Sequence, residues 1–131
     1  MVYLLDTQIL IWSIVSSGKL SKNVKAILQK NTIWVSQVSL FEIAIKQKIG
    51  KLPDFSLTTK DLLRQMSDDG FHLVPIKNAH LSAYEAITLF PEHRDPFDRL
   101  ILVTAFEEDI PVISADENFK LYTLLIRLIK N

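Results

Sequence analysis

The stretch HRDPFDRLILVTAFEEDIPVISADEN, residues 93–118, predicts a helix that leads directly into a buried strand. Asp95 is a preferred helix cap and Pro96 suits the first helical position, so the pair marks the start of a helix over 96–109. The apolar run at 111–114 is typical of a short strand, and Asp116 then precedes a short helix. A helix and a strand joined this closely indicate an α/β fold.

The rest of the chain repeats this alternation. Strands are predicted at 2–5, 32–36 and 71–76, and helices at 7–15, 22–30, 38–52, 58–69 and 78–90, the third of these helices ending near Gly50. Residues 123–129 fit either a last strand or a helical tail. Strands separated by helices form a parallel sheet with helices on both faces. The sequence therefore predicts one α/β domain over residues 1–131, a three-layer sandwich with a mainly parallel central sheet.

The composition of the chain excludes several classes of protein. The 131 residues include no cysteine, which excludes a disulfide framework and a thiolate metal site. A formal net charge of zero removes the strongly basic signature of many nucleic-acid-binding domains. Asp6 and Gln8 interrupt the apolar start, which argues against a signal peptide, and no segment reaches the length of a membrane span. We therefore expect a cytoplasmic protein without a membrane partner.

Acidic residues follow the ends of several predicted strands. In an open parallel sheet, ligands bind beyond the carboxyl ends of the strands. Asp6 follows the first strand, and Asp116 follows the apolar run at 111–114. Glu42 falls in the first turn of the helix after the second strand, and Asp98 lies one turn inside the helix that Asp95 opens. The topology thus predicts that four separate segments place a carboxylate at one edge of the sheet.

Each acid also has a purely structural explanation. Asp6, Asp95 and Asp116 can each cap the helix that follows. Ser39 and Glu42 match a capping box, in which the glutamate side chain bonds back to the serine amide. As a set the acids are harder to explain in this way. Converging carboxylates repel by several kcal/mol per close pair, whereas a helix end offsets only about 0.3–1 kcal/mol.

A bound divalent cation would offset the remaining repulsion. Carboxylate oxygens suit Mg²⁺ or Mn²⁺ rather than zinc. Such an ion keeps several waters that can act as nucleophiles, and it stabilises the charge that develops on a phosphate in transfer. Asp95 and Asp98 share one helix face, so both can point toward the ion, although Asp95 also fits as a simple cap. This edge of the sheet therefore favours metal-dependent phosphoryl chemistry.

Four ordered segments carry a resemblance to a known family: LLDTQILIW at 4–12, VSLFEIAIKQKIGKL at 38–52, HRDPFDRLILVTA at 93–105 and ISADENF at 113–119. Together they resemble the PIN-domain ribonucleases, and most of all the VapC-type toxins of bacterial toxin–antitoxin pairs. The resemblance covers nearly the whole chain. It implies a PIN-like fold and a metal-dependent endoribonuclease that cuts tRNA or rRNA, leaving 5′-phosphate and 3′-hydroxyl ends. It also implies a homodimer and a cognate antitoxin that silences the enzyme.

The resemblance further implies roles for individual residues. The expected ligands of Mg²⁺ or Mn²⁺, which also carry the hydrolysis, are Asp6, Glu42, Asp98 and Asp116. The residues expected to support these ligands or to orient the substrate are Thr7, Ser36, Asn118, Asp95 and Arg99. For Arg99 two roles stand open, because its guanidinium can contact an RNA phosphate or pair with Asp98.

Two positions depart from the pattern of that family. Gln8 stands where many members carry histidine, which weakens any role of this position in proton transfer or substrate contact. The tail KLYTLLIRLIKN, residues 120–131, lacks the glycine-containing turn expected before a final strand. The second departure puts the last strand in doubt. Neither position belongs to the four acids, so the predicted metal site is unchanged.

Two other functions fit the same fold class. A phosphate-accepting signalling domain would need an acidic neighbour beside Asp6 and a lysine after the last core strand, where this chain has Ser114, Ala115 and Asp116. A PIN-like scaffold that binds RNA or protein without catalysis stays open, although all four acids are present. Discrete, metal-dependent cleavage of RNA would separate the enzyme from the scaffold.

The remaining histidines and aromatic residues are expected to be structural. His93 is a lone histidine in a loop beside the acids, a position in which histidine is usually solvated or structural. Trp12, Trp34 and Phe41 are expected to belong to the core rather than to form platforms for stacked bases.

Overall fold

The computed structural model describes all residues from 1 to 131 and contains five strands, six α-helices and two short 3₁₀ helices. The strands are β1 (Val2–Leu5), β2 (Thr32–Ser36), β3 (Phe71–Val74), β4 (Val112–Ser114) and β5 (Leu128–Lys130). The α-helices are α1 (Thr7–Val15), α2 (Lys22–Lys30), α3 (Gln37–Lys48), α4 (Thr59–Asp68), α5 (Asn78–Ala86) and α6 (Pro96–Glu108). The 3₁₀ helices are η1 (Ser17–Lys19) and η2 (Glu117–Tyr122).

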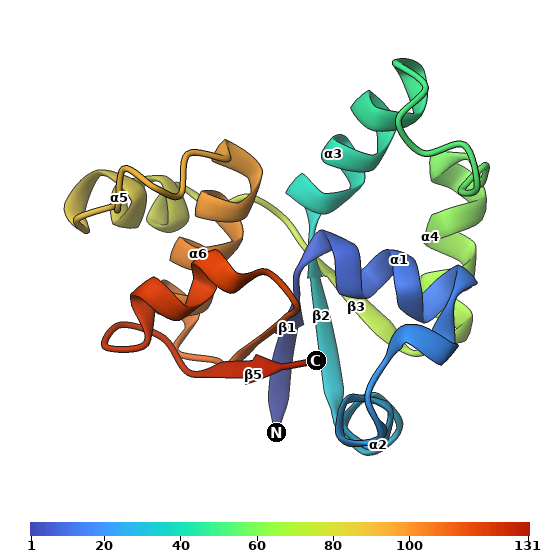
Figure 1. Cartoon of the computed structure of the whole chain (residues 1–131), viewed down its shortest axis with the longest axis horizontal. Coiled ribbons are helices and arrows are strands. Elements are labelled where there is room, and N and C mark those ends of the chain that lie inside the picture. Colours follow the sequence, from blue (N-terminus) through green and yellow to red (C-terminus); the bar gives the residue numbers. More distant parts are fainter.

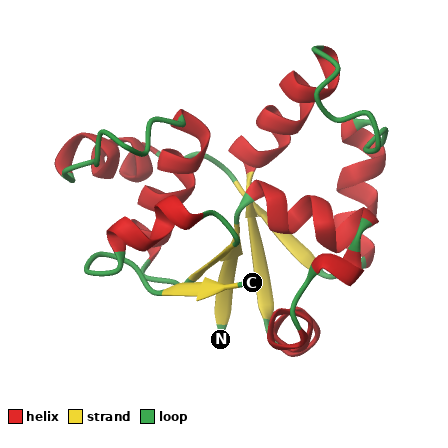
Figure 2. Ribbon diagram, in the orientation of Figure 1, coloured by secondary structure: helices red, strands yellow, loops and turns green.

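The strands form one sheet in the order β3-β2-β1-β4-β5, and every neighbouring pair is parallel. Strand β1 lies at the centre, with Leu5 opposite Val35 on one side and Ile113 on the other. Helices α1, α2 and α4 lie on one side of the sheet, and α5 and α6 lie on the other (Figures 1 and 2). The predicted three-layer α/β sandwich is confirmed, with a fully parallel sheet.

Adjacent residues of the central strand face two different hydrophobic cores. Leu5 packs with Ile9, Leu10 and other residues of the α1 side, whereas Leu4 packs with Ile101 and other residues of the α6 side. Both leucines are fully buried. Because both faces of the sheet are covered, its strands read as continuous apolar runs rather than as alternating patterns.

Helix ends follow the local signals of the sequence. Ser21 caps α2 by accepting a hydrogen bond from the backbone N–H of Val24 at 3.1 Å. Gly50 and Gly70 follow α3 and α4 with φ of 76° and 77°, a left-handed conformation that glycine adopts without a side-chain clash. None of the helices combines the length and the apolar character that a membrane crossing needs.

Several element boundaries differ from the prediction, and α3 ends at Lys48, four residues before the end of the predicted segment 38–52. Strand β3 stops at Val74 because Pro75 has no N–H for the ladder. Helix α5 stops at Ala86, four residues early, since Ile87 takes an extended conformation. The tail is a strand and not a helix, but it begins only at Leu128. The backbone N–H of Asn131 bonds to the carbonyl of Ser114 at 3.1 Å, which extends the pairing of β5 with β4.

Candidate metal centre

The four predicted acids meet at the carboxyl edge of the sheet. Asp6 directly follows β1, Asp116 lies two residues after the end of β4, and Asp98 lies in the first turn of α6. Glu42 projects from the second turn of α3. Together with six other residues they line one pocket of about 230 Å³, whose lining comprises Asp6, Thr7, Gln8, Ile11, Glu42, Lys46, Leu52, Asp95, Asp98 and Asp116. Segments up to 110 residues apart in the sequence thus supply carboxylates to one pocket.

Three of the acids cap helices and also line this pocket. Asp6 Oδ1 accepts a hydrogen bond from the N–H of Ile9 at 2.8 Å. Asp95 Oδ1 accepts from the N–H groups of Phe97 and Asp98, at 2.8 and 3.2 Å. Asp116 Oδ1 accepts from the N–H of Asn118 at 2.8 Å. Each of these acids can therefore cap a helix and also belong to the site, because each cap uses only one of the two carboxylate oxygens.

The predicted capping box of Ser39 and Glu42 is wrong. Helix α3 begins at Gln37, and its cap is Ser36, whose hydroxyl accepts from the N–H of Val38 at 3.2 Å. Ser39 therefore lies inside the helix, where its hydroxyl accepts a hydrogen bond from that of Thr7 at 2.9 Å. Glu42 lies one turn later than predicted, and its side chain faces the pocket instead of the helix end.

Lys46 is the single cationic side chain that lines the pocket, against five carboxylates. Its Nζ lies 2.6 Å from Oε2 of Glu42. The other oxygen of Glu42, Oε1, is buried and has no hydrogen-bond partner. A buried oxygen left without a donor costs about 1–3 kcal/mol, and more when it is charged. The pocket therefore holds more negative charge than its own side chains neutralise.

Sequence reasoning gave no role to Ser114, the last residue of β4. Its hydroxyl donates to Oδ2 of Asp6 and accepts from the backbone N–H of Asp116 at 2.9 Å. The serine thus connects the acid after β1 to the acid after β4, and it is buried. The signal was its place at a strand end, two residues before an acid.

Burial and mutual repulsion disfavour the charged forms of two of the acids. Burial raises the pKa of Asp6 to about 6, although the hydrogen bond from Ser114 acts in the opposite direction. Burial also raises the pKa of Asp98 to about 8, with further contributions from Asp95, Glu42 and the other acids. A bound cation would favour the charged forms of these acids and would thereby stabilise the pocket.

The remaining predicted residues differ in whether they line this pocket. Thr7 and Asp95 line it, whereas Ser36 and Asn118 do not: Ser36 caps α3, and the backbone N–H of Asn118 donates to Asp116. The guanidinium of Arg99 donates to the backbone carbonyls of Phe90 and His93. Arg99 therefore holds the loop that precedes α6 and does not pair with Asp98.

For His93 the sequence favoured a solvated or a structural role, and the structure excludes the solvated one. The residue is buried, and both ring nitrogens lack a hydrogen-bond partner. One of its ring nitrogens and one carboxylate oxygen each of Asp98 and Asp116 all lie within 4.8 Å of one another. Burial lowers the pKa of His93, which favours the neutral imidazole. The sequence could not reveal this burial, because it depends on the packing of the loop against η2.

The donor set fits a divalent cation. The acids supply oxygen ligands from four segments, Glu42 offers an unpartnered oxygen, and no thiolate is present. Mg²⁺ and Mn²⁺ prefer such oxygen-rich sites, whereas structural zinc prefers thiolate and imidazole. The arrangement can therefore hold an ion of the first kind beside an open pocket.

A second hollow of about 220 Å³ adjoins the acidic pocket and shares Gln8, Ile11 and Leu52 with it. The partly exposed indole of Trp12 lines this hollow, and Nζ of Lys19 lies 5.8 Å from its ring centre. Lys51 lies on the loop that forms the other wall. Trp12 thus packs on the core with part of its ring left open.

Two other expectations for aromatic residues had different outcomes. Trp34 packs against the core on the α6 side, as predicted. Phe41 does not belong to the core, because 60% of its surface is exposed. Its position on the outer side of α3 leaves it in edge-to-face contact with Phe97, at 6.1 Å between ring centres.

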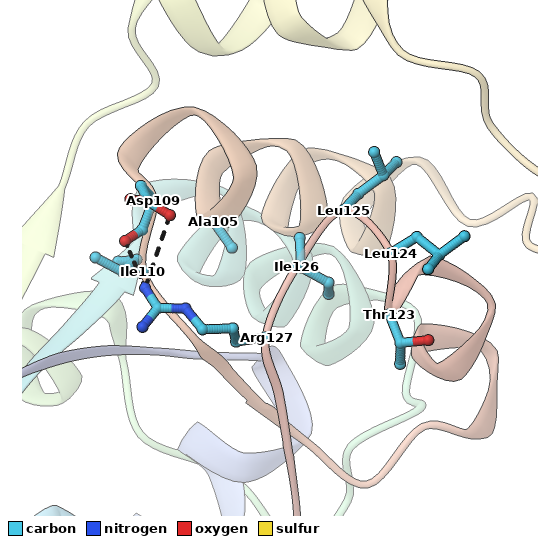
Figure 3. A pocket seen from close by; sticks show the side chains of 8 residues that line it. All are labelled: Ala105, Asp109, Ile110, Thr123, Leu124, Leu125, Ile126 and Arg127. Carbon is cyan, nitrogen blue, oxygen red and sulfur yellow. Dashed lines mark hydrogen bonds and ion pairs between the residues drawn. The ribbon is translucent and has the colours of Figure 1, made fainter.

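A further small pocket, of about 140 Å³, lies at the opposite end of α6 from the acids. Figure 3 shows Asp109 and Arg127 paired at its rim, beside apolar residues such as Ile126. Helix α6 has 13 residues and is about 20 Å long, at 1.5 Å per residue. This pocket therefore has no part in the acidic site.

Comparison with known proteins gives a family and a set of similar folds. The PIN domain family model matches residues 3–123. The structure of VapBC2 from Rickettsia felis, bound to a promoter DNA fragment, is similar with a TM-score of 0.68 and 16% identity, covering 100% of this chain and 99% of that one. A toxin–antitoxin complex from Klebsiella pneumoniae has a TM-score of 0.57 and 20% identity, with 89% of each chain covered. VapBC-5 from Mycobacterium tuberculosis has a TM-score of 0.62 and 14% identity, with 98% and 96% covered. No curated protein sequence matches the chain. At these identities the structural matches show a shared fold.

Proposed function

The chain belongs to the PIN domain family, and on that premise we propose that it is a divalent-metal-dependent endoribonuclease, the toxin of a VapC-type toxin–antitoxin pair. The observation that carries this proposal is the pocket in which Asp6, Glu42, Asp98 and Asp116 meet. Five carboxylates line the pocket against one lysine, an imbalance that a divalent cation would reduce.

The four acids would hold Mg²⁺ or Mn²⁺ at the edge of the sheet. When bound, the ion activates water as a nucleophile and stabilises the charge on a phosphodiester during hydrolysis. The chain's own residues prepare the site for this chemistry. Ser114 donates a hydrogen bond to Oδ2 of Asp6, and the N–H of Ile9 donates one to Oδ1, so the two bonds together fix the orientation of this carboxylate. Lys46 offers an ammonium group that can interact with a phosphate of the substrate.

The hollow beside the acids supports a path for RNA. It opens directly from the acidic pocket through Gln8 and Ile11, and it carries Trp12 with two lysines, Lys19 and Lys51. Lysines bind phosphates, and an open aromatic ring accepts a stacked base. A local surface of this kind can bind RNA although the formal net charge of the chain is zero.

Two protein partners belong to the same proposal. The structural matches include complexes described as toxin–antitoxin and VapBC assemblies, which supports a cognate antitoxin for this chain. Exposed apolar residues lie around a largely apolar pocket of about 400 Å³, among them Phe90 and Leu124. They support a homodimer, whose mass can be measured by light scattering. We place this protein in the cytoplasm, where it would bind both the RNA and the antitoxin.

Cleavage of total tRNA and rRNA by the purified chain tests the activity. We expect discrete cuts in Mg²⁺ or Mn²⁺ that are absent in chelator and absent from Asp6→Ala. Asp68→Asn, which changes an exposed acid at the end of α4, is the matched control and should cut like the wild type. Equal cleavage by Asp6→Ala and the wild type would indicate a contaminating nuclease. A folded wild type that binds metal but cuts no RNA would favour the silent scaffold.

A further inference from the structure

His93 presents a polar side chain that the fold buries without using. The residue is 1% exposed, and neither Nδ1 nor Nε2 has a hydrogen-bond partner. Buried polar groups without partners are rare, because each costs about 1–3 kcal/mol of stability. Its Nε2 lies 3.6 Å from Oδ2 of Asp98, one of the four acids of the pocket. An unsatisfied nitrogen this close to the site calls for a functional explanation.

The fold holds the imidazole rigidly in this place. Its ring packs against the rings of Phe119 and Tyr122, with both pairs of ring centres 5.5 Å apart. The hydroxyl of Tyr122 accepts a hydrogen bond from the N–H of Phe90 at 2.9 Å, and the guanidinium of Arg99 donates to the carbonyls of Phe90 and His93. Loop, helix α6 and helix η2 are thereby joined around the ring. Such a frame fixes where the ring nitrogens lie.

We propose that His93 is a positioning residue: in the metal-loaded protein its imidazole donates a hydrogen bond from Nε2–H to Oδ2 of Asp98. This inference rests on the proposed metal centre. The present separation of 3.6 Å exceeds the usual limit of about 3.2 Å, so a small rotation of the aspartate closes the bond. The bond would hold one carboxylate oxygen of Asp98 and leave the other available to the metal ion.

The chemistry of ligating carboxylates supports this assignment. Groups that bind a metal are usually oriented by a second hydrogen bond, and loss of such a partner lowers metal affinity by about 10- to 100-fold. Asp98 otherwise has no side-chain donor, since Lys46 binds Glu42 and Arg99 binds backbone carbonyls. His93 is therefore the nearby side chain that can donate a hydrogen bond to Asp98.

Two substitutions separate this role from simple packing. His93→Phe keeps an aromatic ring between Phe119 and Tyr122 but removes the donor, whereas His93→Gln keeps a donor. For His93→Phe we expect Mn²⁺ affinity, measured by calorimetry, to fall about tenfold. The melting temperature in chelator should stay equal or rise, because an unsatisfied polar group has been removed. His93→Gln should recover most of the affinity, and His72→Gln, at an exposed position of β3, should match the wild type.

The wild type gives a second test, in which the His93→Gln variant serves only to assign the histidine signal. In ¹⁵N-histidine-labelled wild type, we expect an Nε2–H signal that His93→Gln removes and that Mg²⁺ shifts downfield. An Nε2 that carries no proton in the Mg²⁺-loaded protein would overturn the proposal, since it would indicate a direct ligand. Unchanged Mn²⁺ affinity in a folded His93→Phe would overturn it as well. A wild type that binds neither Mg²⁺ nor Mn²⁺ would refute the metal centre itself. An Nε2–H signal that Mg²⁺ shifts, in a protein that cuts no RNA, would refute only the proposed nuclease activity.

Discussion

Nζ of Lys46 lies 2.6 Å from Oε2 of Glu42, one turn away on α3, so a cation of the chain itself reaches into the acidic pocket. The glutamate side chain is 4% exposed and the lysine side chain 40%. Burial alone would lower the pKa of Lys46, but its hydrogen bond to Glu42 and the nearby charges of Asp95 and Asp98 raise it. Lys46 therefore stays charged and acts as a partial counterion for the pocket.

Lys46→Met should lower stability without metal and increase the gain from metal. In chelator the loss should be about 1 kcal/mol, because the ammonium is partly exposed and solvent screens it. Mg²⁺ should then raise the melting temperature of the variant by more than that of the wild type. Lys48→Met, an exposed lysine on the same helix, is the control. Equal metal-dependent gains in both variants would show that Lys46 does not share the site.

Stability without metal should fall as pH rises from about 4 to about 8. The pKa of Asp6, about 6, and that of Asp98, about 8, lie above the usual value for aspartate in an unfolded chain. Between these pH limits the folded state binds more protons than the unfolded state, so raising the pH destabilises the fold. Melting temperatures in chelator from pH 5 to 9 measure the trend. Saturating Mg²⁺ should flatten it, and a flat profile in chelator would contradict the raised pKa values.

Asp98→Asn should raise stability and abolish cleavage at the same time. The amide keeps the shape of the side chain but removes a carboxylate that burial and neighbouring acids repel. At pH 8 in chelator we expect the melting temperature to rise by a few degrees, which is the effect of about 1 kcal/mol in a domain of this size. Asp68→Asn should change neither property. A variant that melts lower than the wild type would indicate that Asp98 stabilises the fold in its charged form.

Local signals in the sequence were sufficient for most of the fold. The caps at Ser21 and Asp95, the stops at Gly50 and Gly70 and the apolar strands all act over a few residues, so pattern alone located them. The start of β5 was missed because Leu128 pairs with Val112, a long-range contact with no turn signal before it. Short-range patterns therefore fix elements better than they fix pairings.

The site was predictable only as far as topology reaches. Parallel strands bring their carboxyl ends to one edge, which is why Asp6 and Asp116 could be placed together from the sequence. The burial of His93 and the hydrogen bond from Ser114 to Asp6 could not be placed, since both depend on side-chain packing between segments far apart in sequence. The capping box at Glu42 failed for a related reason, because Ser36 caps α3 three residues earlier.

Ser114→Ala should move the pH dependence of metal binding upward. The serine hydroxyl donates to Oδ2 of Asp6 and stabilises its ionised form, which lowers the pKa of this acid against the effect of burial. Without the hydroxyl the acid should ionise about one pH unit higher, since a hydrogen bond to a charged group contributes about 1.5–3 kcal/mol. Mn²⁺ affinity should therefore drop at pH 6 and recover by pH 8. A loss that is equal at both pH values would indicate a structural defect instead.

Trp12→Ala should weaken RNA binding more than it weakens the fold. The indole is partly exposed in the hollow that adjoins the acids, with Lys19 beside its ring. Stacking contributes about 1–3 kcal/mol per base, so RNA affinity should fall between about fivefold and a hundredfold. The measurement uses Asp98→Asn as the background, so that the RNA stays intact, and Trp12→Phe as the matched variant that keeps a ring. Lys51→Ala in the same background should lower the salt dependence of binding by about one phosphate contact. If Trp12→Ala instead leaves RNA affinity unchanged while it abolishes capture by the antitoxin, the hollow binds the protein partner, and the RNA must reach the four acids from another side.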